Sequence, residues 1–101
     1  MIRQDIDIDG YWRVIVVYCA ELGQLNSGFT HTDFDKKRSI VGIGKTDSKE
    51  QFMNTIVHEV KHVQSNICEY YEVPEDGEQA AYLIGYLVMR MYRCFKNMLV
   101  G

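Results

Sequence analysis

The sequence predicts a single α+β domain, in which a small sheet with an edge-strand hairpin is packed by two helices. Strand-like segments rich in β-branched and aromatic residues fill the first half of the chain, and two helical patterns fill the second half. The chain has 101 residues, which is enough for one modest hydrophobic core. We therefore expect 1–101 to form one domain.

The first predicted strand is "YWRVIVVYCA", residues 11–20. Its apolar run is typical of a buried strand, although a short helix has a compatible period. Two further segments, 28–34 and 38–46, flank the turn "DKK" at 35–37. This arrangement predicts a β-hairpin.

The second strand of this hairpin contains two glycines, Gly42 and Gly44. Glycine weakens a strand and often marks a place where another backbone comes close. We therefore expect residues 39–45 to form an exposed edge strand.

The first helix is predicted to begin near Lys49 and to run to about Cys68. Ser48 and Gln51 form a capping-box pattern at its start. Its apolar stripe comprises Phe52, Ile56, Val60, Val63 and Ile67, with Met53 and Val57 beside it. The helical period places His58 and His62 away from that stripe.

The second helix is predicted from Asp76 or Glu78 to Lys96, after a loop that contains Pro74 and Gly77. Its segment "AAYLIGYLVMRMYRCF" is apolar almost all round. Such a helix is either core or a surface for a partner, including a second copy in a homodimer.

Composition excludes several classes of function. The net charge of −3 and the pI near 5.5 argue against nucleic acid as a partner. The longest apolar run, Ala80–Met89, is too short for a membrane span, and the acidic start does not resemble a signal peptide. The chain has three cysteines, namely Cys19, Cys68 and Cys94. They form no disulfide framework, so we expect a cytoplasmic protein with reduced thiols.

Residues 58–62 read His-Glu-Val-Lys-His, which is the H-E-x-x-H pattern. Side chains at i and i+4 share a helix face, so His58 and His62 can bind one zinc ion. Glu59 is offset by about 100° around the helix, where it can reach a zinc-bound water as a general base. The alternative is two unrelated surface histidines.

A catalytic zinc needs a third protein ligand. Glu78 opens the second helix and is followed on its face by the small residues Ala81 and Gly85, which would allow a close approach of the two helices. Glu78 is therefore the predicted third ligand. The alternative is a first-turn acid favoured by the helix dipole.

H-E-x-x-H on one helix and Glu78-Gln79-Ala80-Ala81 on the next resemble the gluzincin type of zinc metallopeptidase. The likeness covers about residues 38–92 and is nearest to the very small gluzincins and to the metallopeptidase domains of mobile-element regulatory proteins. It implies a zincin-like minimal core, with zinc as cofactor and a peptide or protein substrate held along the 39–45 strand.

The resemblance implies peptide hydrolysis through a zinc-bound water, with Glu59 as general base. It does not fix a group that stabilises the transition state; the candidates are His31, Tyr70, Tyr71 and Tyr82. A non-catalytic zinc-binding interaction module is the alternative, and a zinc hydrolase acting on another substrate would use the same residues.

Overall fold

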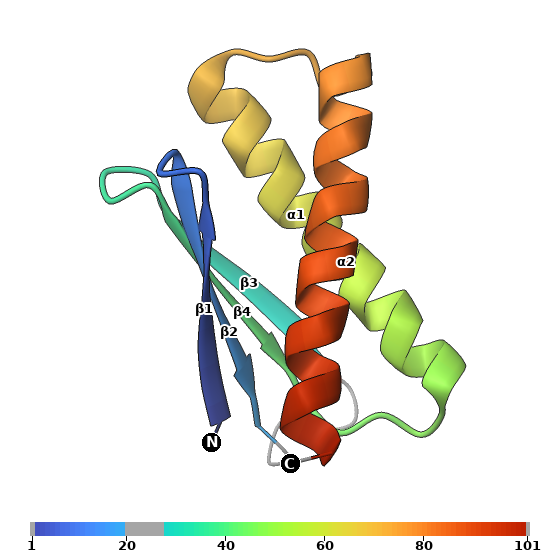
Figure 1. The fold of residues 1–101 in the computed structure, drawn as a ribbon. Helices are drawn as coiled ribbons and strands as arrows, with labels where there is room; N and C mark the ends of the chain where they lie inside the picture. Colours follow the sequence, from blue (N-terminus) through green and yellow to red (C-terminus); the bar gives the residue numbers. More distant parts are fainter. Residues whose placement is uncertain (1, 20–27, 101) are drawn as a thin grey trace.

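The computed structural model describes residues 2–19 and 28–100 (Figure 1). Four strands precede two helices, which confirms the α+β class. The elements are β1 (Ile2–Ile8), β2 (Trp12–Tyr18), β3 (Gly28–Asp33), β4 (Arg38–Ile43), α1 (Lys49–Tyr71) and α2 (Glu78–Val100). The predicted strand at 11–20 and the predicted hairpin are both present, although residue 20 lies outside the described ranges.

The sheet has the order β1-β2-β4-β3, with β2 and β4 parallel and the other two pairs antiparallel. Ile15 and Val17 of β2 lie on the face away from the helices and are still buried. A strand that is apolar on both faces belongs in the interior of a sheet. β2 accordingly pairs with a neighbour along each edge.

The prediction of an exposed edge strand at 39–45 is wrong. Ile40 of β4 pairs with Ile15 of β2 on one side and with His31 of β3 on the other. β4 is therefore an inner strand, and the outer strand of the hairpin is β3. The hairpin pattern identifies two paired strands but contains no information on which of them also pairs with β2.

Gly42 also has a different role from the predicted one. It lies opposite Phe29 in the β3–β4 register, and a Cβ placed on it would lie 2.1 Å from the Phe29 ring. The space that the missing side chain leaves is filled by the aromatic ring of the neighbouring strand, a pairing that compensates for glycine in sheets.

Both helices begin where their sequence patterns predict. The Ser48 hydroxyl accepts a hydrogen bond from the backbone N–H of Gln51 at 3.0 Å, which caps α1. The C-cap of α1 is Glu72, whose φ of 57° is left-handed. α1 runs three residues and α2 four residues beyond the predicted ends.

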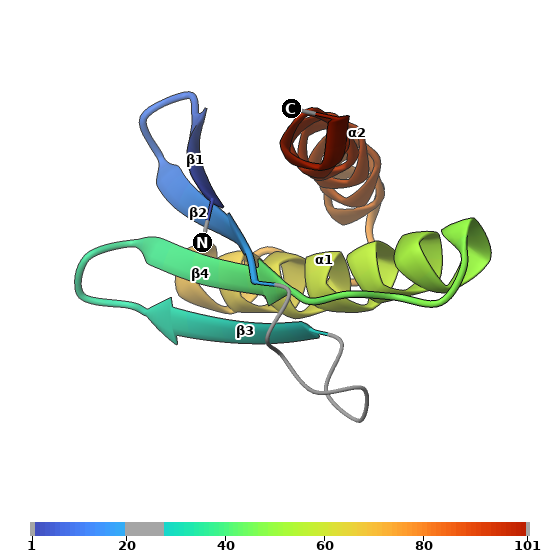
Figure 2. The same cartoon turned by 90° about the horizontal axis from the view of Figure 1, so that it is seen from below.

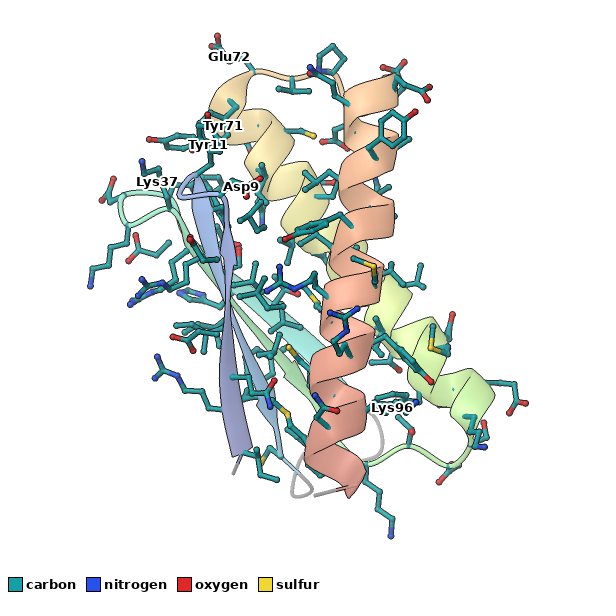
Figure 3. All side chains as sticks on the ribbon, in the orientation of Figure 1. Asp9, Tyr11, Lys37, Tyr71, Glu72 and Lys96 are labelled. Carbon is teal, nitrogen blue, oxygen red and sulfur yellow. The ribbon has the colours of Figure 1, made fainter. Side chains whose placement is uncertain are left out.

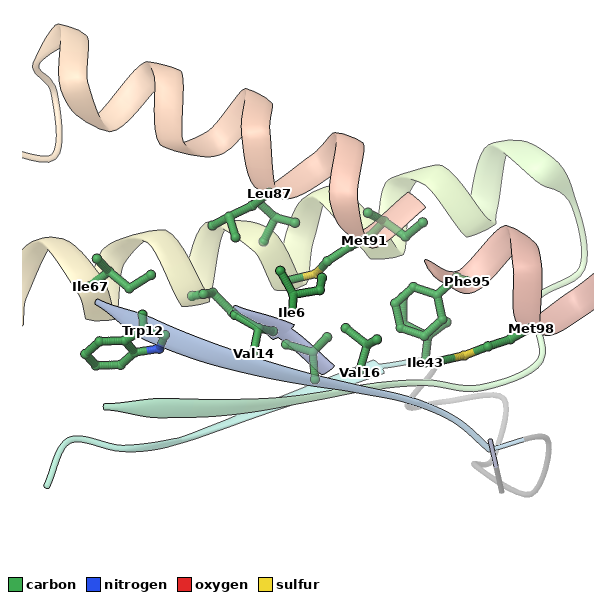
Figure 4. Close-up of a cluster of buried hydrophobic side chains, with 14 residues drawn as sticks. Ile6, Trp12, Val14, Val16, Ile43, Ile67, Leu87, Met91, Phe95 and Met98 are labelled. Carbon is green, nitrogen blue, oxygen red and sulfur yellow. The ribbon is translucent and has the colours of Figure 1, made fainter. Parts of the chain in front are cut away.

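The helices cover one face of the sheet (Figures 1 and 2). α1 contacts β3 and β4, whereas α2 contacts β1 and β2, and the two helices also contact each other. The core lies between these layers (Figure 4). It includes Ile56, Val60, Val63 and Ile67 of the predicted α1 stripe, with Phe52 and Met53 partly buried against it, whereas Val57 is exposed. The sheet and α2 contribute further apolar residues, among them Ile6, Trp12, Val14, Val16, Val41, Ile43, Leu87, Met91 and Phe95.

In the described ranges no helix combines the length and the apolar character that crossing a membrane requires. Cys19, Cys68 and Cys94 are all free thiols. Burial raises the pKa of the Cys68 and Cys94 thiols, so their thiolate forms are disfavoured.

Candidate metal centre

His58 and His62 project from the exposed face of α1. The buried residues of the same helix, Ile56, Val60 and Val63, lie on the opposite side. The two imidazole rings have centroids 4.9 Å apart, and their Nε2 atoms lie 3.2 Å from each other. The predicted separation of the histidines from the packing stripe is confirmed.

The distance between the two Nε2 atoms fits a shared zinc ion. Zinc binds histidine nitrogen at about 2.0–2.1 Å with tetrahedral angles. Two such ligands are therefore about 3.3–3.4 Å apart, close to the 3.2 Å between His58 Nε2 and His62 Nε2. The two rings are thus close enough for both nitrogens to bind the same ion.

Glu59 is turned toward the sheet rather than toward solvent. Only 5% of its surface is exposed, and its Oε1 accepts a hydrogen bond of 2.7 Å from the Thr30 hydroxyl. Thr30 belongs to the edge strand β3. The carboxylate between the two histidines in the sequence thus lies at the junction of α1 and β3.

Gly28 makes the close approach of β3 to this carboxylate feasible. A Cβ at Gly28 would lie 2.9 Å from Cγ2 of Thr55 and 3.0 Å from Oε2 of Glu59. Real Cβ atoms essentially never show the first distance, and the second is tighter than nine in ten real Cβ contacts. Any larger residue at this position would separate the strand from Glu59.

A second polar contact joins β3 to α1. The amide of Asn66 donates to the Thr32 hydroxyl at 2.7 Å, and Thr32 in turn shares a hydrogen bond with Ser39 of β4. The Trp12 indole also donates to the Ser39 hydroxyl. Buried polar groups that satisfy one another in this way fix the orientation of the elements that carry them.

One edge of β3 is paired with β4, and within residues 2–19 and 28–100 no strand pairs with its other edge. Because Thr30 and Thr32 point toward α1, alternation places His31 on the opposite face of the sheet. β3 itself packs against α1, the helix that carries the histidine pair.

The predicted third ligand, Glu78, is exposed in the first turn of α2. No group of three or more His, Cys, Asp or Glu side chains is arranged to hold a metal within residues 2–19 and 28–100. The described arrangement thus brings His58 and His62 together but does not gather Glu78 with them.

A different acid on the segment between the helices contacts α1. Glu75 Oε2 lies 3.3 Å from Lys61 Nζ and accepts a 3.1 Å hydrogen bond from the Ser65 hydroxyl. Gln64, which is fully buried, donates to the Glu75 carbonyl. No local sequence pattern predicts this contact.

The four candidates for transition-state stabilisation lie in different places. Tyr70 and Tyr71 pack in an aromatic cluster around Trp12, and the Tyr71 hydroxyl donates to the Tyr11 carbonyl at 2.6 Å (Figure 3). This cluster lies about 13 Å along α1 beyond His62. His31 is on the far face of the sheet, and Tyr82 is 72% exposed on α2.

Comparison with models of protein families, with curated proteins and with solved structures returns no match. The assignment of a function therefore depends on the chemistry of the site.

Proposed function

We propose that the protein is a zinc-dependent hydrolase that cleaves peptide bonds, with His58 and His62 as zinc ligands. The observation that carries this proposal is the 3.2 Å separation of the two Nε2 atoms. The pair lies on an exposed face of a well-packed helix, so substrate and solvent can reach it. When bound, zinc would supply Lewis-acid activation of water and of the scissile carbonyl.

Glu59 is assigned the role of general base in this proposal. A carboxylate can take the proton of the attacking water and deliver it to the leaving amine. Its contact with Thr30 holds it at the α1–β3 junction, and its second oxygen is the one that remains for the water. The hydrogen bond from Thr30 would thereby orient the base.

Glu78 remains the proposed third ligand. Its carboxylate takes part in no hydrogen bond or ion pair with the described residues, whereas Glu75 is engaged with Lys61 and Ser65. Glu78 is exposed, so its side chain can change rotamer at little cost. Ligation would then couple the start of α2 to α1.

We place the extended substrate along β3 instead of the inner strand β4. β3 is the outermost strand among the described residues, and it contacts the helix of the histidine pair. A peptide that adds to a sheet edge is held through its main chain, which gives orientation with little sequence selectivity. The expected substrate class is therefore an extended segment of peptide or protein.

Two glutamine variants test the assignment of roles. Glu59→Gln should keep about one zinc per chain and a nearly intact fold but lose cleavage of a peptide library, because the base is removed. Glu78→Gln should lose zinc, because a ligand is removed. Zinc is measured by elemental analysis and cleavage by mass spectrometry.

Glu75→Gln is the matched control, since it changes a nearby acid of the same segment. It should keep both zinc and cleavage. Equal zinc loss in Glu75→Gln and Glu78→Gln would contradict the ligand assignment, and cleavage that survives in Glu59→Gln would remove that residue as the base.

One observation favours a second candidate, a non-catalytic zinc-binding interaction module. Glu59 is almost completely buried and bonded to Thr30, as expected of a residue that only fastens α1 to β3. In such a module, zinc would bind His58 and His62 without turnover. Wild-type protein that binds zinc but cleaves no peptide in the library would support this candidate.

A further inference from the structure

The exposed face of α2 carries a regular stripe of residues. Its positions are Glu78, Tyr82, Gly85, Met89, Tyr92 and Lys96. The spacings alternate between four and three residues, the 3.5-residue period by which one helix packs along another. At about 100° per residue, these positions fall within roughly 80° of arc and oppose the buried Leu87.

The residues of this stripe do not belong to the hydrophobic core. All six residues are exposed, and Tyr82 and Met89 have 72% and 48% of their surface accessible. The core side of α2 is formed instead by Leu87, Met91 and Phe95. Figure 2 shows α2 at a corner of the fold, with the sheet and α1 on two sides and no other element of the described chain beyond it.

The stripe is complementary to itself when reversed. Two antiparallel copies centred on position 87 would place Glu78 opposite Lys96, Tyr82 opposite Tyr92 and Gly85 opposite Met89. The acidic Glu78 then faces the basic Lys96, and the two tyrosine rings face each other. Gly85, which has no side chain, faces the long, flexible side chain of Met89. A two-fold symmetric dimer needs such a self-complementary patch.

Gly85 has no function within the single chain. A Cβ added there would meet nothing within 4 Å, and glycine inside a helix costs about 1 kcal/mol relative to alanine. Across an antiparallel pair, the same glycine gives space to Met89 of the second copy. The dimer thus accounts for a residue that the monomer fold leaves unexplained.

Charge along α2 favours the same antiparallel arrangement. Its one acid, Glu78, is at the start, and its basic residues, Arg90, Arg93 and Lys96, follow in the second half. Antiparallel copies bring the acidic end against the basic end and also align the helix dipoles favourably. Lys96 lies near the end of α2 (Figure 3), 6.0 Å from the ring centroid of Tyr92.

A groove lies beside the second half of the stripe. It has a volume of about 800 Å³ and is lined mainly by apolar side chains, namely Phe52, Met53, Val88, Met89 and Tyr92, with Lys49 and Lys96 at its rim. In the antiparallel register, Tyr82 of a second copy comes opposite Tyr92 and so reaches the groove. Symmetry repeats this contact at the other end.

We propose that α2 forms an antiparallel homodimer through this stripe, centred on position 87, with Tyr82 of each copy seated in the groove of the other. The seam is about 27 Å long, which gives a small interface and a dissociation constant on the order of 10–100 µM. The dimer does not require Glu78, since an exposed ion pair contributes little.

Sedimentation velocity on protein treated with chelator, from about 5 to 500 µM, should show a monomer–dimer equilibrium. Met89→Glu should weaken it by at least about 30-fold, since two like charges would be buried in the seam. Gln79→Glu adds the same charge at an exposed position outside the stripe and should leave the monomer–dimer equilibrium unchanged. Met89→Glu that dimerises like wild type, or wild type that remains monomeric throughout, overturns the proposal.

A charge exchange tests the register. Glu78→Lys and Lys96→Glu should each weaken the dimer by about 3- to 10-fold, and the two together should restore it to within about twofold of wild type. A double variant that is no tighter than either single one overturns the antiparallel register. Because the protein is metal-free, these results do not depend on the proposed hydrolase activity.

Discussion

His58 and His62 bring their Nε2 atoms to 3.2 Å, a distance that two arrangements share. One is a hydrogen bond between neutral rings, in which one nitrogen donates and the other accepts. The other is joint ligation of one ion, in which both nitrogens are unprotonated and point at the metal. The separation of the two nitrogen atoms is therefore compatible with either arrangement.

Thr30 links Glu59, the neighbour of His58 in the sequence, to the sheet. Thr30→Val keeps the shape of the side chain but removes the donor to the Glu59 carboxylate. A buried acceptor that loses its partner costs about 1–3 kcal/mol, so we expect the free energy of unfolding in urea to fall by that amount. Thr30→Ser, which keeps the hydroxyl, should lose much less.

The control for this prediction is a double-mutant cycle. In a Glu59→Gln background, the charge at the acceptor is already gone, so Thr30→Val should cost less than it does in wild type. If the cost is the same in both backgrounds, the hydrogen bond does not stabilise the junction.

Among the elements, β3 has the smallest apolar contribution. Its helix-facing positions are Gly28, Thr30 and Thr32, which meet α1 through hydrogen bonds and through one close approach of backbone. An edge strand attached in this way is held in register by polar contacts rather than by core packing. Small changes in side-chain volume there should therefore be costly.

Gly28→Ala tests that packing. Its Cβ would overlap Thr55 Cγ2 and the Glu59 carboxylate, and overpacking of this kind costs about 1–3 kcal/mol. We expect a lower melting temperature and faster amide exchange in β3.

Thr55→Ser removes the overlapping methyl group and should recover part of the loss. A Gly28→Ala variant as stable as wild type, with unchanged exchange in β3, would show that the strand can shift without cost.

For the whole molecule, zinc should raise the melting temperature. A ligand that binds only the folded state stabilises it by about 2.7 kcal/mol at 100-fold excess over its dissociation constant. For a domain of this size, that corresponds to about 10–20 °C. Thermal melts with zinc and with chelator measure the effect, and magnesium, which prefers oxygen ligands, should not reproduce it.

His58→Ala should abolish most of this increment. His31→Ala is the matched control, because it removes the remaining histidine from the far face of the sheet and should keep the increment in full. Equal loss in both variants would mean that zinc binds without the α1 pair.

Local sequence determined the elements that depend on local physics. The cap at Ser48, the apolar stripe of α1 and the i, i+4 spacing of the histidines are short-range patterns, and each is present in the structure. The first strand, β1, was not predicted, although Ile6 and Ile8 alternate with charged residues in the way of a strand. Its acidic residues obscured that period.

Tertiary pairing decided what the local patterns leave open. Whether β3 or β4 forms the edge depends on which of them pairs with β2. β2 and β4 lie about 25 residues apart in the sequence, and no local spacing encodes their pairing. The same holds for Glu59, whose burial against Thr30 follows from where β3 lies, and for Gly42, whose neighbour is the Phe29 ring. The sequence alone thus determined the helices and the histidine pair, whereas only the packed sheet decided which strand lies beside them, because strand order is set by long-range burial rather than by period.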